Sequence, residues 1–107
     1  MRQLDPPPAI DGDDRATEMI RVWLAHNQLH VSILLGMWAD AEDSEIDERN
    51  AWGHLLADLA RHIARGLRQS HGLNENTTIA WIRQEFLENL SDSDHSVEGE
   101  YLDDDQG

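Results

Sequence analysis

Residues 29–37 read Leu-His-Val-Ser-Ile-Leu-Leu-Gly-Met. Apolar and other side chains alternate over most of this stretch, and two of the apolar ones, Val31 and Ile33, are β-branched. A period of two with β-branched residues is typical of a strand, so the sequence predicts a strand over 29–37, with a continued helix as the alternative. Gly36 then marks a bulge or a close approach of another segment.

A single strand needs partners, because the hydrogen-bonding groups along its backbone are otherwise unsatisfied. Three sources of a partner strand are open: the C-terminal tail, a second copy of the chain, and another protein. The segment 96–102, Ser-Val-Glu-Gly-Glu-Tyr-Leu, alternates weakly and offers one short strand. Because a small chain without cross-links often gains stability by oligomerising, we expect homodimerisation to complete the strand edge.

Helical periodicity is found in three segments. The first is 16–27, upstream of the strand. The second, 45–71, is the longest and meets Gly72, a residue suited to ending a helix. The third, 75–90, follows Asn74, a residue type favoured at helix N-caps. The apolar stripes at helical spacing are Met19, Ile20, Trp23 and Leu24 in the first segment, Trp52, Leu56, Leu59, Ile63 and Leu67 in the second, and Ile79, Ile82, Phe86 and Leu90 in the third.

Composition divides the chain into three parts. Residues 1–15 hold three prolines and several turn-forming residues, which favours an extended leader. Residues 16–90 hold the three helical segments and the main strand, and are predicted to form a single globular domain. Residues 91–107 carry seven acidic residues and form an acidic tail, within which 96–102 is the candidate strand. The predicted fold is therefore α+β, with three helices packed on one or two short strands.

The charge of the chain is strongly one-sided. There are 22 acidic residues against 8 basic ones, and the formal net charge is −14. Such a chain repels nucleic acid and the anionic inner leaflet of a membrane, so neither is predicted as a partner. All eight basic residues are arginines, which excludes lysine Schiff-base chemistry.

Cysteine is absent, so disulfides and zinc sites built on thiolates are excluded. The first ten residues contain no apolar run of the kind found in secretory signals. The longest apolar run, 33–38, is far shorter than the roughly 20 residues that span a bilayer. These features predict a protein of the bacterial cytoplasm.

The longest predicted helix carries one constellation of the kind that binds metals. His54, Asp58 and His62 are spaced four apart and therefore project from about the same side. Imidazole nitrogens and carboxylate oxygens are ligands for zinc and other divalent cations. The two histidines lie about 12 Å apart along the axis, too far to share one ion. A metal site would need one of them with ligands from elsewhere, and a solvated face with local ion pairs is the alternative.

A second feature of this helix is a run of positive charge. Residues 61–71 contain three arginines, two histidines and no acid. Arg61, Arg65 and Arg68 share one side of the helix and complement the negative end of its dipole. We also consider them as partner-binding residues that receive an acidic segment, either residues 103–105 of the chain's own tail or a segment of another protein.

The remaining candidates, His30 and Ser32, lie two apart on the predicted strand and hence on one face of it. We consider them as partner-binding positions at the strand. A catalytic role would need an acid from elsewhere in the fold, and the chain has neither a Gly-x-Ser-x-Gly elbow nor a glycine-rich phosphate loop. No catalytic residue and no cofactor are therefore expected.

Several runs of the sequence resemble a bacterial family of unknown function whose chains have about a hundred residues. The more specific runs are Gly-Met-Trp at 36–38 and Ala-Trp-Gly at 51–53, flanked by Leu-His-Val-Ser at 29–32, Asp-Glu-Arg-Asn at 47–50 and Leu-Leu-Ala-Asp-Leu-Ala-Arg-His at 55–62. The resemblance covers residues 16–90. It implies no assigned activity, so no catalytic residue is carried over.

These observations favour a non-catalytic protein-interaction or regulatory module that works as a homodimer and binds protein through its acidic surface and strand edge. The alternative is a metal- or small-molecule-binding protein that uses His54, Asp58, His62 or His30. A melting temperature that responds to metal would favour the alternative.

Overall fold

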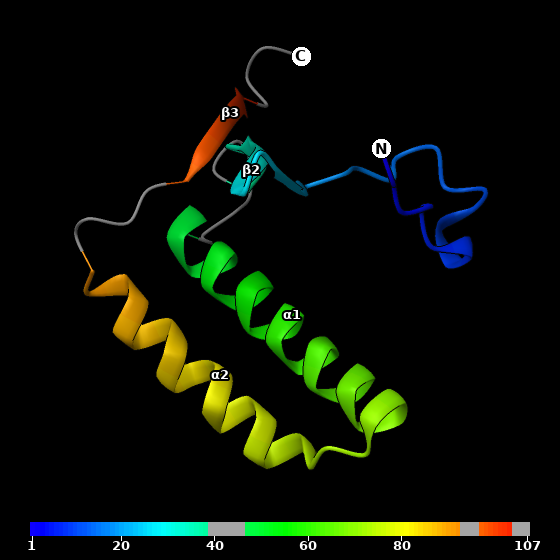
Figure 1. Ribbon diagram of the computed structural model, residues 1–107. Helices are drawn as coiled ribbons and strands as arrows, with labels where there is room; N and C mark the ends of the chain where they lie inside the picture. Colours follow the sequence, from blue (N-terminus) through cyan, green and yellow to red (C-terminus); the bar gives the residue numbers. More distant parts are fainter. Residues whose placement is uncertain (39–46, 93–96, 104–107) are drawn as a thin grey trace.

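A three-stranded sheet and a pair of helices are the main elements in the part of the chain that the computed structural model describes, residues 1–38, 47–92 and 97–103 (Figure 1). In chain order the elements are a short 3-10 helix η1 (Pro8–Ile10), strand β1 (Ile20–Ala25), strand β2 (Gln28–Leu35), helix α1 (Glu48–His71), helix α2 (Glu75–Leu90) and strand β3 (Glu98–Asp103).

Strands β1 and β2 form an antiparallel hairpin, so the predicted helix at 16–27 is wrong. Val22 lies opposite Val31 in the register of the pair. His26 and Asn27 both have positive φ angles, 53° and 60°, as the two central residues of a type I′ hairpin turn require. The apolar spacing of β1 fits a helix and a strand equally well, and pairing with the predicted strand at 29–37, which β2 confirms, decides between them.

Strand β3 occupies the other side of β2 and runs parallel to it, giving the strand order β1-β2-β3. Ile33 lies opposite Tyr101, and Leu35 lies opposite Asp103. Both edges of β2 are thus filled by segments of the same chain. The expectation that a second copy completes the edge of this strand is therefore wrong.

The two longer predicted helices are confirmed over the described residues, which leave out 45 and 46 of the first, and the ends of α1 and α2 follow local signals. The Asp47 carboxylate accepts a hydrogen bond from the Arg49 backbone amide at the start of α1. Hydrogen bonds from the Arg49 side chain and backbone lower the pKa of Asp47 to about 2. Gly72 ends α1 in the left-handed conformation, with φ 69°. Asn74 caps α2 by accepting from the Thr77 amide at 2.9 Å.

The side chain of Glu48 ties the end of β2 to the start of α1. Its carboxylate accepts hydrogen bonds from the backbone amides of Gly36 (2.9 Å) and Trp38 (3.1 Å). It also accepts one from the indole Nε1 of Trp52 at 3.0 Å. The rings of Trp38 and Trp52 meet edge to face, 5.5 Å between centroids. The Gly-Met-Trp and Ala-Trp-Gly runs therefore come together at this junction.

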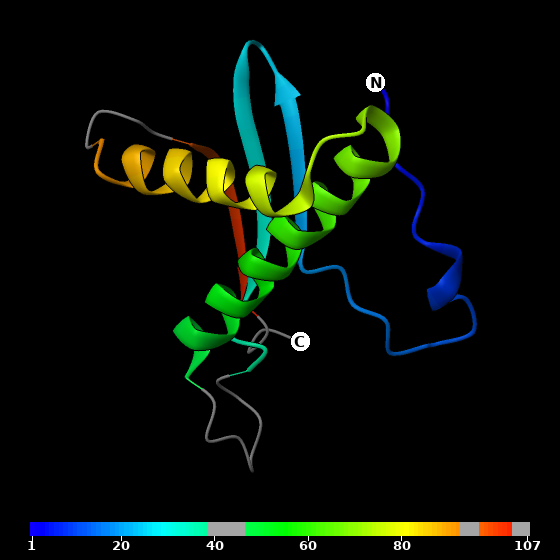
Figure 2. The same ribbon diagram turned by 90° about the horizontal axis from the view of Figure 1, so that it is seen from below.

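The fold class thus needs correction within a mixed α+β architecture: two helices accompany a three-stranded sheet, not three helices on one or two strands. The helices pack against each other and lie on one side of the sheet (Figures 1 and 2). From below, the turn between β1 and β2 projects past both helices (Figure 2). Helix α1 starts near the sheet and leads away from it (Figure 1).

Candidate interaction surface

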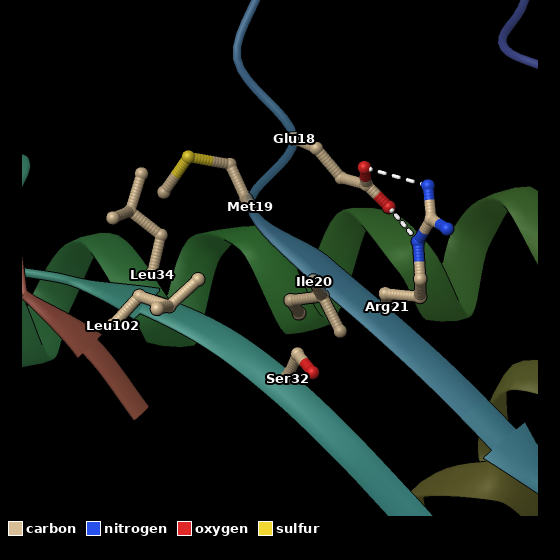
Figure 3. Close-up of a pocket in the computed structure, with 7 residues that line it drawn as sticks. All are labelled: Glu18, Met19, Ile20, Arg21, Ser32, Leu34 and Leu102. Atoms are coloured by element: carbon tan, nitrogen blue, oxygen red, sulfur yellow. Dashed lines mark hydrogen bonds and ion pairs between the residues drawn. The ribbon is translucent and has the colours of Figure 1, made fainter. Parts of the chain in front are cut away.

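The sheet has two chemically different faces. On the face seen in Figure 3, a hollow of about 270 Å³ is lined by both polar and apolar residues. Ser32 lies in it beside an ion pair in which the Arg21 guanidinium donates to both carboxylate oxygens of Glu18, at 2.6 and 2.9 Å. The hydrogen bonds from Arg21 lower the pKa of Glu18. The lining residues are Glu18, Met19, Ile20, Arg21, Ser32, Leu34 and Leu102.

The opposite face of the sheet is apolar, and α1 passes behind the strands on this side in Figure 3. Because residues two apart share a face, the register places one set of large apolar residues here. Three of them are strongly exposed: Val22 at 53%, Leu24 at 84% and Tyr101 at 76% of the maximum. This face is therefore only partly covered by the chain itself. The set is Val22, Leu24, Leu29, Val31, Ile33 and Tyr101, and we call it the open sheet face.

The helix pair also leaves apolar side chains uncovered. The stripe predicted as core on α1 is half exposed at Ile63 (52%), and Trp81 on α2 is 69% exposed. A hollow of about 340 Å³ lies between the helices. We call the exposed apolar residues of the pair the helix face: Leu56, Leu59, Ile63, Trp81, Phe86, Leu87 and Leu90. The predicted stripes contain five of these residues, Leu56, Leu59, Ile63, Phe86 and Leu90, but not Trp81 or Leu87, and the fold of one chain buries none of the seven.

The total exposed surface of the chain is larger than that of a compact monomer. The chain exposes 9617 Å², whereas a compact monomer of its 12.2 kDa exposes about 6,100 Å². Its radius of gyration is 16.1 Å, against about 13 Å for a compact chain of this length. Among the described residues, Ala51 and Ala64 are the buried apolar ones. Two alanines are a very small core for a folded domain.

The predicted metal residues lie along one hollow and not around one point. His54, Asp58 and His62 line a shallow hollow of about 690 Å³ together with Trp38 and Leu59. The Asp58 carboxylate accepts from Arg61 at 2.7 Å, so it already has a cationic partner. In the part of the chain that the structure describes, no group of three or more His, Cys, Asp or Glu side chains gathers closely enough to hold a metal.

The predicted arginine patch is partly neutralised within the chain. Arg61 pairs with Asp58, and Arg68 pairs with Glu75 of α2 at 3.3 Å. Arg65 is exposed on the same helix. Residues 104 and 105 of the suggested docking segment lie outside the described residues. The backbone of Asp103 pairs with that of Leu35 in the sheet, at the end of β2 that leads toward the start of α1.

The predicted strand residues, His30 and Ser32, lie on the same face of the sheet, as their spacing required, and this is the face that carries the hollow of Figure 3. The Nε2 atom of His30 lies 3.1 Å from the backbone carbonyl oxygen of Ala25, and its ring meets that of His26 edge to face. Ser32 lines the hollow of Figure 3, whereas His30 does not. The structure thus gives His30 a local partner inside the hairpin.

Comparison with known proteins identifies the family. Residues 3–93 match the model of a domain of unknown function, DUF5076. The chain belongs to the DUF5076 family. This agrees with the resemblance to a family of unknown function whose chains have about a hundred residues. Strand β3 of this DUF5076 chain lies beyond the matched residues.

A solved structure has a similar fold. It is described as "Structure of a putative pyruvate dehydrogenase from the photosynthetic bacterium Rhodopseudomonas palustrus CGA009". It is 25% identical to this DUF5076 chain, with a TM-score of 0.63 and 94% of each chain covered. No curated protein matches the chain. Within the described residues, neither helix is long and apolar enough to cross a membrane.

Proposed function

We propose that this DUF5076 chain is a non-catalytic protein-interaction module that works as a homodimer in the bacterial cytoplasm. The observation that carries the proposal is the exposure of the open sheet face and the helix face, where Leu24 and Tyr101 are more than three-quarters exposed. Exposed apolar patches of this kind mark protein-binding surfaces. The net charge of −14 favours protein over nucleic acid or anionic lipid as the partner. The related structure from a bacterium supports the setting.

The solution mass tests this proposal. We expect light scattering to give twice the chain mass of 12.2 kDa at micromolar concentration, because the open apolar faces are then covered. Replacing Ile63 with glutamate puts a charge on the helix face and is expected to shift the mass toward one chain. Gln69→Glu adds the same charge elsewhere on exposed α1 and is expected to leave the mass unchanged. A folded wild-type chain that stays monomeric would contradict the homodimer.

A second candidate is a metal- or small-molecule-binding protein. It is favoured by one observation, that His54, Asp58 and His62 line the same hollow. Against it stand the roughly 12 Å between the histidines along the helix and the ion pair of Asp58 with Arg61.

Thermal melting with zinc chloride separates the two candidates. The interaction module is expected to melt within about 1 °C of the same temperature with and without zinc, since a ligand stabilises only what it binds. A rise of several degrees that a chelator reverses and His62→Ala abolishes would favour the metal site. Gln69→Ala on the same helix is the matched control and is expected to behave as the wild type.

The pyruvate dehydrogenase description of the related structure is not part of the proposal. The glycines of this chain are scattered and form no glycine-rich phosphate loop. Two charged pairs, Glu18 with Arg21 and Asp58 with Arg61, lie at hollows of the described surface. A binding surface explains these features with fewer assumptions than an enzyme does.

A further inference from the structure

We propose that in the homodimer the helix face of each copy covers the open sheet face of the other, so that the two chains exchange their covering layers. This inference rests on the proposed function, because it specifies which surfaces meet in the homodimer. The observation behind it is that each chain has an apolar sheet face and an apolar helix pair, and that neither of them covers the other.

The first support is the pattern of packing within one chain. The substantial close approaches between elements are β1 with β2, β2 with β3, and α1 with α2. The strands thus pack with one another and the two helices pack with each other, whereas the helix pair packs only slightly on the sheet. The exposure of Val22 and Leu24 on the open sheet face shows the consequence. In a mixed α+β domain a helix layer normally covers such a face.

The second support is chemical matching. The open sheet face presents aliphatic residues and Tyr101, and the helix face presents leucines with Ile63, Trp81 and Phe86. Two chains with a net charge of −14 repel each other, so a stable contact needs surfaces without fixed charge. The other sheet face carries Glu18 and Arg21 and is less suited to that role.

The third support is area. The chain exposes 9617 Å², about 3,500 Å² more than a compact monomer of its mass, and part of this excess belongs to the extended leader. Obligate homodimers bury about 2,000–5,000 Å² in total over the two chains. The excess is therefore large enough for a second copy. An interface of two helix faces alone would leave Leu24 and Tyr101 exposed, whereas reciprocal exchange covers both surfaces under one twofold axis.

Mixing two charged variants tests which surfaces meet. Val22→Lys places a cation on the open sheet face, and Ile63→Glu places an anion on the helix face. Each variant alone is expected to dimerise about 100-fold more weakly, because both copies of its interface hold an unpaired charge. In an equimolar mixture, one interface is native and the other pairs lysine with glutamate. We therefore expect native mass spectrometry to show a mixed dimer with a Kd at least tenfold lower than that of either variant alone.

Matched controls place the same charges elsewhere on the same elements. Gln28→Lys lies at an exposed position on the other face of β2, and Gln69→Glu lies on exposed α1; both are expected to dimerise as the wild type does. Circular dichroism checks that each variant is folded. If Val22→Lys fails to fold, Tyr101→Lys on β3 replaces it, since this side chain is 76% exposed.

The chain has no cysteine, so introduced ones give an independent measurement. A Leu24→Cys chain mixed with an Ile63→Cys chain is expected to form a mixed covalent dimer with a bismaleimide linker. Dimerisation of Val22→Lys at wild-type strength, or failure of this cross-link, would overturn the exchange while the homodimer stands. A monomeric wild type would overturn both the exchange and the homodimer.

Discussion

Replacing Glu48 with alanine is expected to lower the free energy of unfolding by about 3 kcal/mol, because hydrogen-bond donors at the β2–α1 junction lose a charged acceptor. The amides of Gly36 and Trp38 and the indole N–H of Trp52 all donate to this carboxylate. The side chain is partly buried, so water replaces these contacts incompletely. The loss also separates the strand from the helix that follows it.

Urea unfolding at one fixed protein concentration measures this effect, since the stability of a homodimer depends on concentration. Glu48→Gln keeps an acceptor oxygen and removes the charge, and is expected to lose less than Glu48→Ala. Glu85→Ala, on the exposed surface of α2, is the matched control and is expected to change stability by no more than about 0.5 kcal/mol. If Glu48→Ala has the same free energy of unfolding as the control variant, the stability of the junction does not depend on this carboxylate.

The two long helices could be predicted because their signals are local. Gly72 and Asn74 act at helix ends through their own conformation and their own side chains, so neighbouring residues alone reveal them. The strand at 29–37 was recognisable for the same reason, since alternation with β-branched residues is a local property.

Strand β1 could not be predicted in the same way. Ile20 and Trp23 satisfy helical spacing, whereas the pairing of Val22 with Val31 that makes β1 a strand depends on a turn at residues 26–27. That turn contains His26-Asn27 and lacks the glycine that usually announces a type I′ hairpin. Asparagine and histidine are both enriched at positive φ, so His26-Asn27 is a weak signal for this turn.

The candidate surface was predictable only in part. The stripe containing Leu59 and Ile63 was correctly placed on one side of α1. Periodicity identifies the apolar side of a helix, but it does not show whether the same chain or a second chain packs on that side. The same limit holds for the hydrogen bonds of Glu48, which join residues ten and twelve positions apart. For His54 and His62, helix geometry predicts a separation of about 12 Å along the axis, whereas the hollow that both residues line depends on the tertiary fold.

Replacing Gly99 with alanine is expected to detach β3 from the sheet. Gly99 lies opposite Val31 in the parallel register, with φ 154°, and a Cβ atom there would overlap the backbone carbonyl of Val31. A backbone carbonyl inside a strand pair cannot move aside without breaking the ladder, so the new methyl group displaces the whole segment. The hydrogen bonds between β2 and β3 are then lost together.

Hydrogen exchange measures the detachment directly. We expect the β3 amides to lose about 100-fold or more of their protection in Gly99→Ala, because local opening replaces a paired state. Gly53→Ala is the matched control: its Cβ meets nothing within 4 Å, and in a helix this change is expected to stabilise by roughly 0.5–1 kcal/mol. The same substitution should thus have opposite effects at the two sites. Unchanged protection of β3 in Gly99→Ala would show that the strands do not approach at Val31, because an alanine could then be accommodated.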